Sequence, residues 1–145
     1  MAQLTGKTII ITGSSRGVGA DTAQILAAEG ANIVVNYRSK APRANKIVKA
    51  IEEAGGKAIA VQADVTNNDD LQNLVNTAVE TFGSLDYLIL NASGGMETGM
   101  GEDYAMRLNR DAQLNLARLA AEKMPEGARI VFVTSHQAHF IREVE

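Results

Sequence analysis

The chain has 145 residues and a formal net charge of −3, and hydrophobic residues make up 46% of it. This length and composition predict one globular domain over residues 1–145 with a buried core, and they exclude a disordered chain. The sequence contains no cysteine. This excludes disulfides, cysteine-ligated zinc, iron–sulfur clusters and a cysteine nucleophile.

The distribution of charged and apolar residues also limits which partners the protein can bind and where in the cell it is expected. Acidic and basic residues are interleaved, and aromatic residues are only 4% of the chain, which argues against a nucleic-acid-binding surface. No apolar run is long enough to cross a bilayer, and residues 1–7 lack the form of a signal peptide. We therefore expect no membrane partner and a cytoplasmic location, which the absence of cysteine permits.

Apolar, β-rich runs alternate with helical patterns along the whole chain. The sequence predicts, in order, a strand at residues 7–12, a helix at 17–29, a strand at 33–36, a helix at 42–54, a strand at 57–61, a helix between 66 and 83, a strand at 85–90, a helix at 103–123 and a strand at 129–134. Most of these strands are continuous apolar runs, which is typical of strands covered on both faces. The alternation therefore predicts a three-layer α/β fold, with a parallel sheet between two layers of helices.

The clearest helical pattern lies between Thr66 and Gly83. Apolar residues recur there at the spacing of one helix face, namely at Leu71, Leu74, Val75, Ala78, Val79 and Phe82. We expect Thr66 to cap the N-terminus of this helix, with Asp69 three residues further on, and Gly83 to end it.

A glycine-rich loop joins the first predicted strand to the first predicted helix. Its glycines follow the spacing G-x-x-x-G-x-G, and its residues are Thr12, Gly13, Ser14, Ser15, Arg16, Gly17, Val18 and Gly19. Glycines permit a tight turn and a close approach of the backbone to a pyrophosphate, which the N-terminus of the following helix attracts. No Gly-Lys-Ser/Thr follows, so the loop is not a P-loop. The pattern predicts binding of a dinucleotide.

This loop and three later segments together resemble the short-chain dehydrogenase/reductase family. The loop is similar to that family's cofactor motif. Ala63-Asp64-Val65 resembles its adenine-contacting segment, and Asn91-Ala92-Ser93 resembles its Asn-Ala-Gly turn with Ser93 in place of glycine. Val133-Thr134-Ser135 resembles the segment that carries its catalytic serine.

The resemblance covers essentially the whole chain and implies both a fold and a reaction. It implies a Rossmann-type doubly wound sheet with strand order 3-2-1-4-5, and a nicotinamide dinucleotide across the carboxyl ends of the strands, between the first and the fourth. It also implies hydride transfer to or from a small carbonyl or alcohol substrate.

The end of the second strand predicts which nicotinamide cofactor is preferred. In dinucleotide folds an acidic residue there binds the ribose 2′-hydroxyl, but here that position is Tyr37, and no Asp or Glu is nearby. Arg38 follows it, Arg16 lies in the glycine loop, and Ser39 adds a hydroxyl. Two guanidinium groups suit a 2′-phosphate, so we expect NADP(H) in preference to NAD(H).

The resemblance also assigns catalytic residues. Ser135 matches the serine that orients the substrate carbonyl, and Asn109 matches the asparagine that holds a water relay; Asn115 on the same predicted helix is the rival assignment. The family's Tyr-x-x-x-Lys motif is absent, because Tyr37, Tyr87 and Tyr104 are not followed by a lysine four residues later.

Two explanations of the missing motif are open. The first is that the chain is the front part of a longer reductase. The resemblance implies that this reductase is a homo-oligomer (dimer or tetramer), since the helix at 103–123 resembles the surface that the family uses for dimers. The second is a catalytically silent nucleotide-binding module. We favour the first, because an uncovered fifth strand would be an apolar edge prone to aggregation. By itself the 145-residue chain is expected to bind the cofactor weakly at best and to be inactive.

Other chemistries are disfavoured by the residues present. His136 and His139 have the spacing of metal ligands but lack further candidate ligands, so we expect no metal site. A hydrolase built on Ser135 and His136 is disfavoured because no G-x-S-x-G elbow surrounds the serine. A Rossmann-type methyltransferase fits poorly, because the Arg16 and Arg38 pair implies an additional phosphate.

Overall fold

The structure is a computed structural model that describes residues 4–14, 17–39, 41–64, 66–91 and 102–133. In these residues strands and helices alternate strictly: β1 (Thr8–Ile11), α1 (Gly17–Ala28), β2 (Asn32–Tyr37), α2 (Ala41–Glu53), β3 (Lys57–Gln62), α3 (Asn68–Phe82), β4 (Tyr87–Asn91), α4 (Glu102–Ala121) and β5 (Arg129–Val133). No helix within these ranges is long and apolar enough to cross a membrane.

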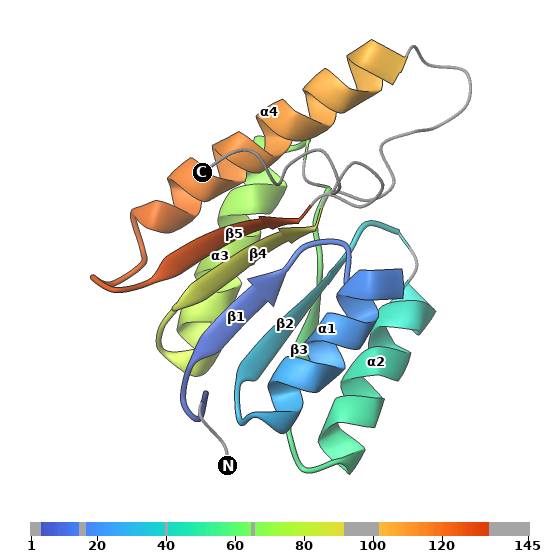
Figure 1. Ribbon diagram of the computed structural model, residues 1–145, viewed down its shortest axis with the longest axis vertical. Helices are drawn as coiled ribbons and strands as arrows, with labels where there is room; N and C mark the ends of the chain where they lie inside the picture. The colour runs from blue at the N-terminus through green and yellow to red at the C-terminus, as the bar shows by residue number, and fades with distance from the viewer. Residues whose placement is uncertain (1–3, 15–16, 40, 65, 92–101, 134–145) are drawn as a thin grey trace, which may run out of the picture.

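The strands form one parallel sheet in the order β3-β2-β1-β4-β5. Helices α1 and α2 lie on one face of the sheet and α3 and α4 on the other (Figure 1). The predicted doubly wound Rossmann-type sheet and its strand order are confirmed. The order reverses at β1, whose neighbours β2 and β4 lead away to opposite edges, and such a switch point is where doubly wound folds bind ligands.

The central strands are buried on both faces because helices cover both. Every residue of β1 is buried; Ile10 packs toward α3 and α4, whereas Ile9 and Ile11 pack toward α1 and α2. This alternation of side chains between two cores explains why the strands read as continuous apolar runs.

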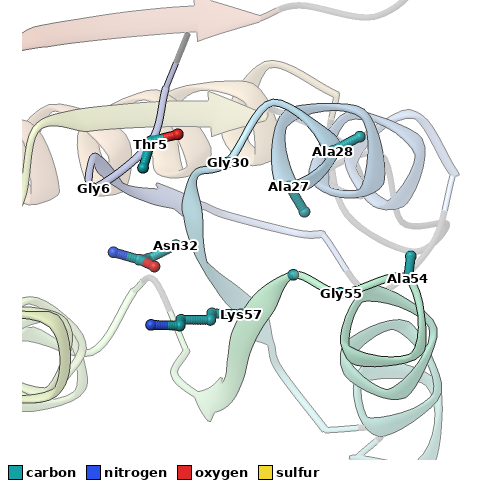
Figure 2. Close-up of a pocket in the computed structure, with 10 residues that line it drawn as sticks. Thr5, Gly6, Ala27, Ala28, Gly30, Asn32, Ala54, Gly55 and Lys57 are labelled. Atoms are coloured by element: carbon teal, nitrogen blue, oxygen red, sulfur yellow. The ribbon is translucent and has the colours of Figure 1, made fainter. Parts of the chain in front are cut away.

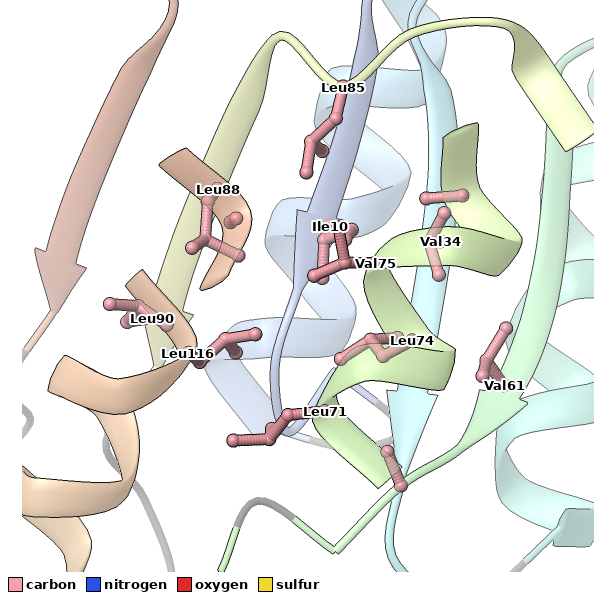
Figure 3. Close-up of a cluster of buried hydrophobic side chains, with 13 residues drawn as sticks. Ile10, Val34, Val61, Leu71, Leu74, Val75, Leu85, Leu88, Leu90 and Leu116 are labelled. Carbon is pink, nitrogen blue, oxygen red and sulfur yellow. The ribbon is translucent and has the colours of Figure 1, made fainter. Parts of the chain in front are cut away.

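The predicted apolar stripe of α3 forms the centre of one core. Leu71, Leu74 and Val75 are almost completely buried against β1 and β2, and Leu116 joins them from α4 (Figure 3). Full burial of one such side chain contributes about 1.5–3 kcal/mol. The spacing of these residues in the sequence therefore fixed which face of α3 meets the sheet.

The N-cap of α3 differs by one residue from the prediction. The cap is Asn67, whose side-chain oxygen accepts a hydrogen bond of 3.0 Å from the Asp70 backbone N–H. Thr66 instead donates from both its hydroxyl and its N–H to Asp64, so it is not available to the helix. At the other end Gly83 caps α3 with a left-handed φ of 92°, as predicted.

Candidate functional site

The glycine-rich loop lies at the carboxyl end of β1, at the switch point of the sheet (Figure 1). Gly13 and Gly17 have φ values of 61° and 63°, which residues with a Cβ rarely adopt. A Cβ on Gly17 would meet nothing within 4 Å, so the backbone is open where α1 begins. Open backbone at a helix N-terminus offers N–H groups and a positive dipole end to an anionic ligand.

Gly19 is required for a different reason, which is close packing. A Cβ on Gly19 would lie 2.6 Å from the carbonyl oxygen of Gly13 and 2.7 Å from Nδ2 of Asn91. It would also lie 2.9 Å from the Cα of Ser14. The absence of a side chain therefore lets the first turn of α1 pack directly on the loop and on the end of β4.

The peptide groups of Gly13 are held from both sides by asparagines of the neighbouring strands. Oδ1 of Asn36, on β2, accepts a hydrogen bond of 3.1 Å from the N–H of Gly13. Nδ2 of Asn91, on β4, donates a hydrogen bond of 3.3 Å to the carbonyl of Gly13. The backbone N–H of Asn91 also donates to the hydroxyl of Thr12 at 2.9 Å. The loop is thus positioned by β2 and β4 together.

Ser14, predicted as a cofactor residue, faces the interior. It is fully buried, its hydroxyl donates to the Ile11 carbonyl at 2.7 Å, and the same oxygen accepts from the N–H of Asn36 at 3.0 Å. The N–H of Ser14 donates in turn to the Asn36 carbonyl at 3.1 Å. The polar groups that Ser14 could offer a ligand therefore hold the loop against β2.

Asn36 is a residue of the site that the sequence analysis missed. Asparagine is depleted in strands, so its presence at the end of the buried run of β2 was a signal that could have identified it. Its partners belong to two other segments of the chain, and local pattern does not predict them.

The end of β2 and the residues after it place the side chain of Arg38 on the surface beside this site. Tyr37 is half-buried and packs against the core beneath α1 and α2. Arg38 and Ser39 are exposed. Nε of Arg38 lies 4.0 Å from Oδ2 of Asp64, with side chains 73% and 37% exposed. An ion pair of this length and exposure is weak, so the guanidinium is available to another anion.

Asp64 lies at the carboxyl end of β3, after the buried Ala63. Its carboxylate accepts from the hydroxyl of Thr66 at 2.6 Å and from the Thr66 N–H at 2.9 Å. These two hydrogen bonds hold the pKa of Asp64 below its ordinary value of 3.8, and the bond from the Thr66 hydroxyl has the largest effect. Burial raises the pKa, and the charge of Arg38 lowers it by a smaller amount. Asp64 is therefore ionised at neutral pH.

Part of the predicted catalytic group lies outside the described residues. The structure shows Asn109 within α4 but does not describe its side chain, and the same holds for Val18 in α1. The remaining predicted positions outside the described ranges are Ser15, Arg16, Val65, Ala92, Ser93, Ser135, His136 and His139. Asn115, the rival of Asn109, donates from Nδ2 to Oδ1 of Asn68 at 2.8 Å, so its amide joins α4 to α3.

A separate hollow lies at the opposite end of the sheet. It has a volume of about 370 Å³ and is lined by the C-terminal ends of α1 and α2 and the starts of β2 and β3 (Figure 2). Gly30, Gly55 and Lys57 lie on its wall. Because it is at the amino ends of the strands, it does not belong to the site built around the glycine loop.

Comparison with known proteins decides the family. The sequence profile described as short chain dehydrogenase matches residues 7–144. The chain belongs to the short-chain dehydrogenase family. The predicted resemblance is thereby confirmed, and the match gives no support to the methyltransferase and hydrolase alternatives that the sequence disfavoured. The comparisons give no support to a catalytically silent module.

Several relatives of this chain are named reductases. The chain is 39% identical over 142 residues to versicolorin reductase 1 from Dothistroma septosporum, covering 94% of this chain and 54% of that protein. It is 39% identical over 140 residues to a probable tetrahydroxynaphthalene reductase from Zymoseptoria tritici, covering 92% and 52%. The chain thus spans about half the length of the curated relatives it matches.

Solved structures of short-chain dehydrogenases share the fold. A short chain dehydrogenase from Burkholderia cenocepacia, crystallised in complex with NADP, superposes with a TM-score of 0.82 at 38% identity. The superposition covers 94% of this chain and 58% of that one. The fold of this chain therefore occurs in a protein that was crystallised with NADP.

Proposed function

We propose that this chain is the cofactor-binding part of an NADP(H)-dependent oxidoreductase that acts on a small carbonyl or alcohol compound. The observation that carries the proposal is the glycine loop at the switch point, with Gly19 packed on Gly13 and the backbone open at Gly17. The relatives named as reductases support the same class of reaction.

The residues of the site fit a bound dinucleotide. The backbone at Gly17 and the N-terminus of α1 would receive the pyrophosphate. Ionised Asp64, at the end of β3, would accept a hydrogen bond from the adenine side, and Asn91 would border the nicotinamide side. When bound, the nicotinamide supplies or accepts the hydride, while the protein provides orientation and hydrogen bonds.

The preference for the 2′-phosphate rests on charge. Tyr37 occupies the position where a carboxylate would bind a ribose hydroxyl and repel a phosphate. Arg38 is exposed, and its only ion pair among the described residues is the weak one with Asp64. A phosphate carries more charge than one carboxylate and accepts paired guanidinium hydrogen bonds. We propose that Arg38, with Arg16 and Ser39, contacts the 2′-phosphate.

The proposed chemistry assigns roles to two further residues. Ser135 orients the substrate carbonyl by hydrogen bonding, and Asn109 holds a water in the proton relay. The 145 residues contain no Tyr-x-x-x-Lys, so we expect turnover to require a tyrosine and a lysine that this sequence does not contain. We further propose that the active protein is a homo-oligomer.

Titration of the chain with NADPH and with NADH tests the cofactor proposal directly. Nicotinamide fluorescence reports binding of both reduced cofactors. We expect saturable binding of NADPH, with a Kd at least tenfold lower than that for NADH. Absence of saturable binding by either cofactor would refute the dinucleotide proposal, and equal Kd values would refute only the preference for the 2′-phosphate.

A further inference from the structure

Asn36 joins three segments of the chain at the carboxyl edge of the sheet. Only 3% of the surface of Asn36 is exposed. Oδ1 accepts from the N–H of Gly13 at 3.1 Å. Nδ2 donates to the carbonyls of Val61 at 3.4 Å and of Ala63 at 3.3 Å. One carboxamide thus connects the glycine loop after β1 with the end of β3.

The chemistry of these partners requires an amide in one orientation. A carboxamide has one acceptor oxygen and two N–H donors, and here it faces one N–H and two carbonyl oxygens. The flipped amide would place N–H against the N–H of Gly13 and oxygen against two carbonyls. An aspartate would keep the acceptor for Gly13, but it would bury a charge facing the carbonyls of Val61 and Ala63.

The backbone of Asn36 adds a second connection to the same loop. Its N–H donates to the hydroxyl of Ser14, and its carbonyl accepts from the N–H of Ser14. Substitution of the side chain leaves both of these bonds possible. The side chain alone accepts from the N–H of Gly13, and it links the glycine loop to the carbonyls of Val61 and Ala63 beside the backbone pairing of β2 with β3.

The two segments joined by Asn36 are the two that the proposed function places against the cofactor. The glycine loop faces the pyrophosphate, and the end of β3 continues from Ala63 into Asp64 on the adenine side. We propose that Asn36 is a positioning residue that sets the spacing between the pyrophosphate loop and the adenine side of the site before the cofactor binds. This inference rests on the proposed function, and it assigns a role to a residue that does not itself touch the ligand.

The test compares Asn36→Ala with Val34→Ala. Val34 is on the same strand two residues earlier, is fully buried and contacts neither the loop nor the end of β3 by a side-chain hydrogen bond. Both variants lose buried contacts and are expected to be less stable, so NADPH titrations are made at a temperature where each is folded by circular dichroism. We expect Asn36→Ala to raise the Kd for NADPH at least tenfold and Val34→Ala to change it less than twofold.

A second measurement reports the contact without any ligand. Amide hydrogen exchange at Gly13, followed by NMR, should become at least tenfold faster in Asn36→Ala and stay unchanged in Val34→Ala and Asn36→Asp. The aspartate variant retains the acceptor for Gly13 but loses both donors, so we expect its Kd for NADPH to rise as well.

The outcomes separate this inference from the proposed function. Binding of NADPH by the unsubstituted chain, with equal Kd increases in Asn36→Ala and Val34→Ala, would overturn the role of Asn36 and leave the proposed function intact. Unchanged Gly13 exchange in Asn36→Ala would also overturn it. No NADPH binding by the unsubstituted chain would overturn the proposed function and this inference together.

Discussion

Replacing Gly19 by alanine tests the close packing on which the glycine loop depends. The added Cβ would lie 2.6 Å from the Gly13 carbonyl oxygen, 2.7 Å from Nδ2 of Asn91 and 2.9 Å from the Cα of Ser14. Two of these three atoms are backbone, so the strain is relieved only if α1 or the loop moves. Overpacking of this kind costs about 1–3 kcal/mol.

Two smaller effects modify that figure. Alanine is favoured over glycine inside a helix by about 0.5–1 kcal/mol, which opposes the strain. Displacement of the Asn91 side chain would lose its 3.3 Å hydrogen bond to Gly13, a loss of about 1 kcal/mol. These two effects nearly cancel. The expected loss in the free energy of unfolding therefore stays at about 1–3 kcal/mol.

Urea unfolding measures this loss, and NADPH titration measures its effect on the site. Gly56→Ala is a suitable control, because its Cβ would also be crowded, at 2.9 Å from Cγ2 of Ile51 and 3.3 Å from the Ile51 carbonyl oxygen, but at the opposite end of the sheet. We expect Gly19→Ala to raise the Kd for NADPH at least tenfold and Gly56→Ala to leave it unchanged. If Gly19→Ala is as stable as the original chain and binds NADPH equally well, the packing argument is wrong.

Three further predictions concern charge and capping. Arg38→Asp should raise the Kd for NADPH at least tenfold more than the Kd for NADH. The control Arg118→Asp, on the exposed side of α4, should change neither Kd. A similar loss of affinity for both cofactors in Arg38→Asp would remove Arg38 from the proposed phosphate site. Asp64 has a pKa below its ordinary value when folded, so it stabilises the chain above about pH 4, and this contribution is lost as the pH falls through the folded pKa. The Asp64→Asn variant should therefore show a shallower loss of stability in urea unfolding between pH 5 and pH 2. The difference should be less than about 1 kcal/mol, because the Asp64 side chain is 37% exposed; identical pH profiles would contradict this. Asn67→Ala should lower the free energy of unfolding by about 1 kcal/mol, as expected for loss of an N-cap; a change under about 0.3 kcal/mol would show that Asn67 does not cap α3.

The fold was predictable from the sequence because its signals are local. Runs of apolar residues such as 7–12 identify strands covered on both faces, and the spacing of Leu71, Leu74 and Val75 identifies the buried face of α3. Side-chain direction repeats every two residues in a strand and about every 3.6 in a helix, so periodicity shows which residues are inside. The glycine spacing likewise predicted a dinucleotide loop, since much of the need for glycine is local: Gly13 and Gly17 have positive φ, and Gly19 packs on Gly13 and Ser14.

The cap of α3 shows where local signals stop being sufficient. Thr66 and Asn67 are both good cap residues, and the sequence does not distinguish them. The choice falls on Asn67 because Asp64 engages both the hydroxyl and the N–H of Thr66. Asp64 is itself held by the adjoining turn, where its N–H donates to Oδ2 of Asp70 at 2.9 Å.

The sequence by itself determined the order of elements, the three-layer fold and the position of the glycine loop in the chain. Only the tertiary structure decided how that loop is held: Ser14 turned inward, and Gly13 was bound between Asn36 and Asn91. Those asparagines are 23 and 78 residues away from Gly13 in sequence. Their contacts with Gly13 exist because the strand order places β2 and β4 on either side of β1. A hydrogen bond forms only between atoms about 3 Å apart, so these bonds depend on which strands are neighbours and not on the residues next to Gly13 in sequence.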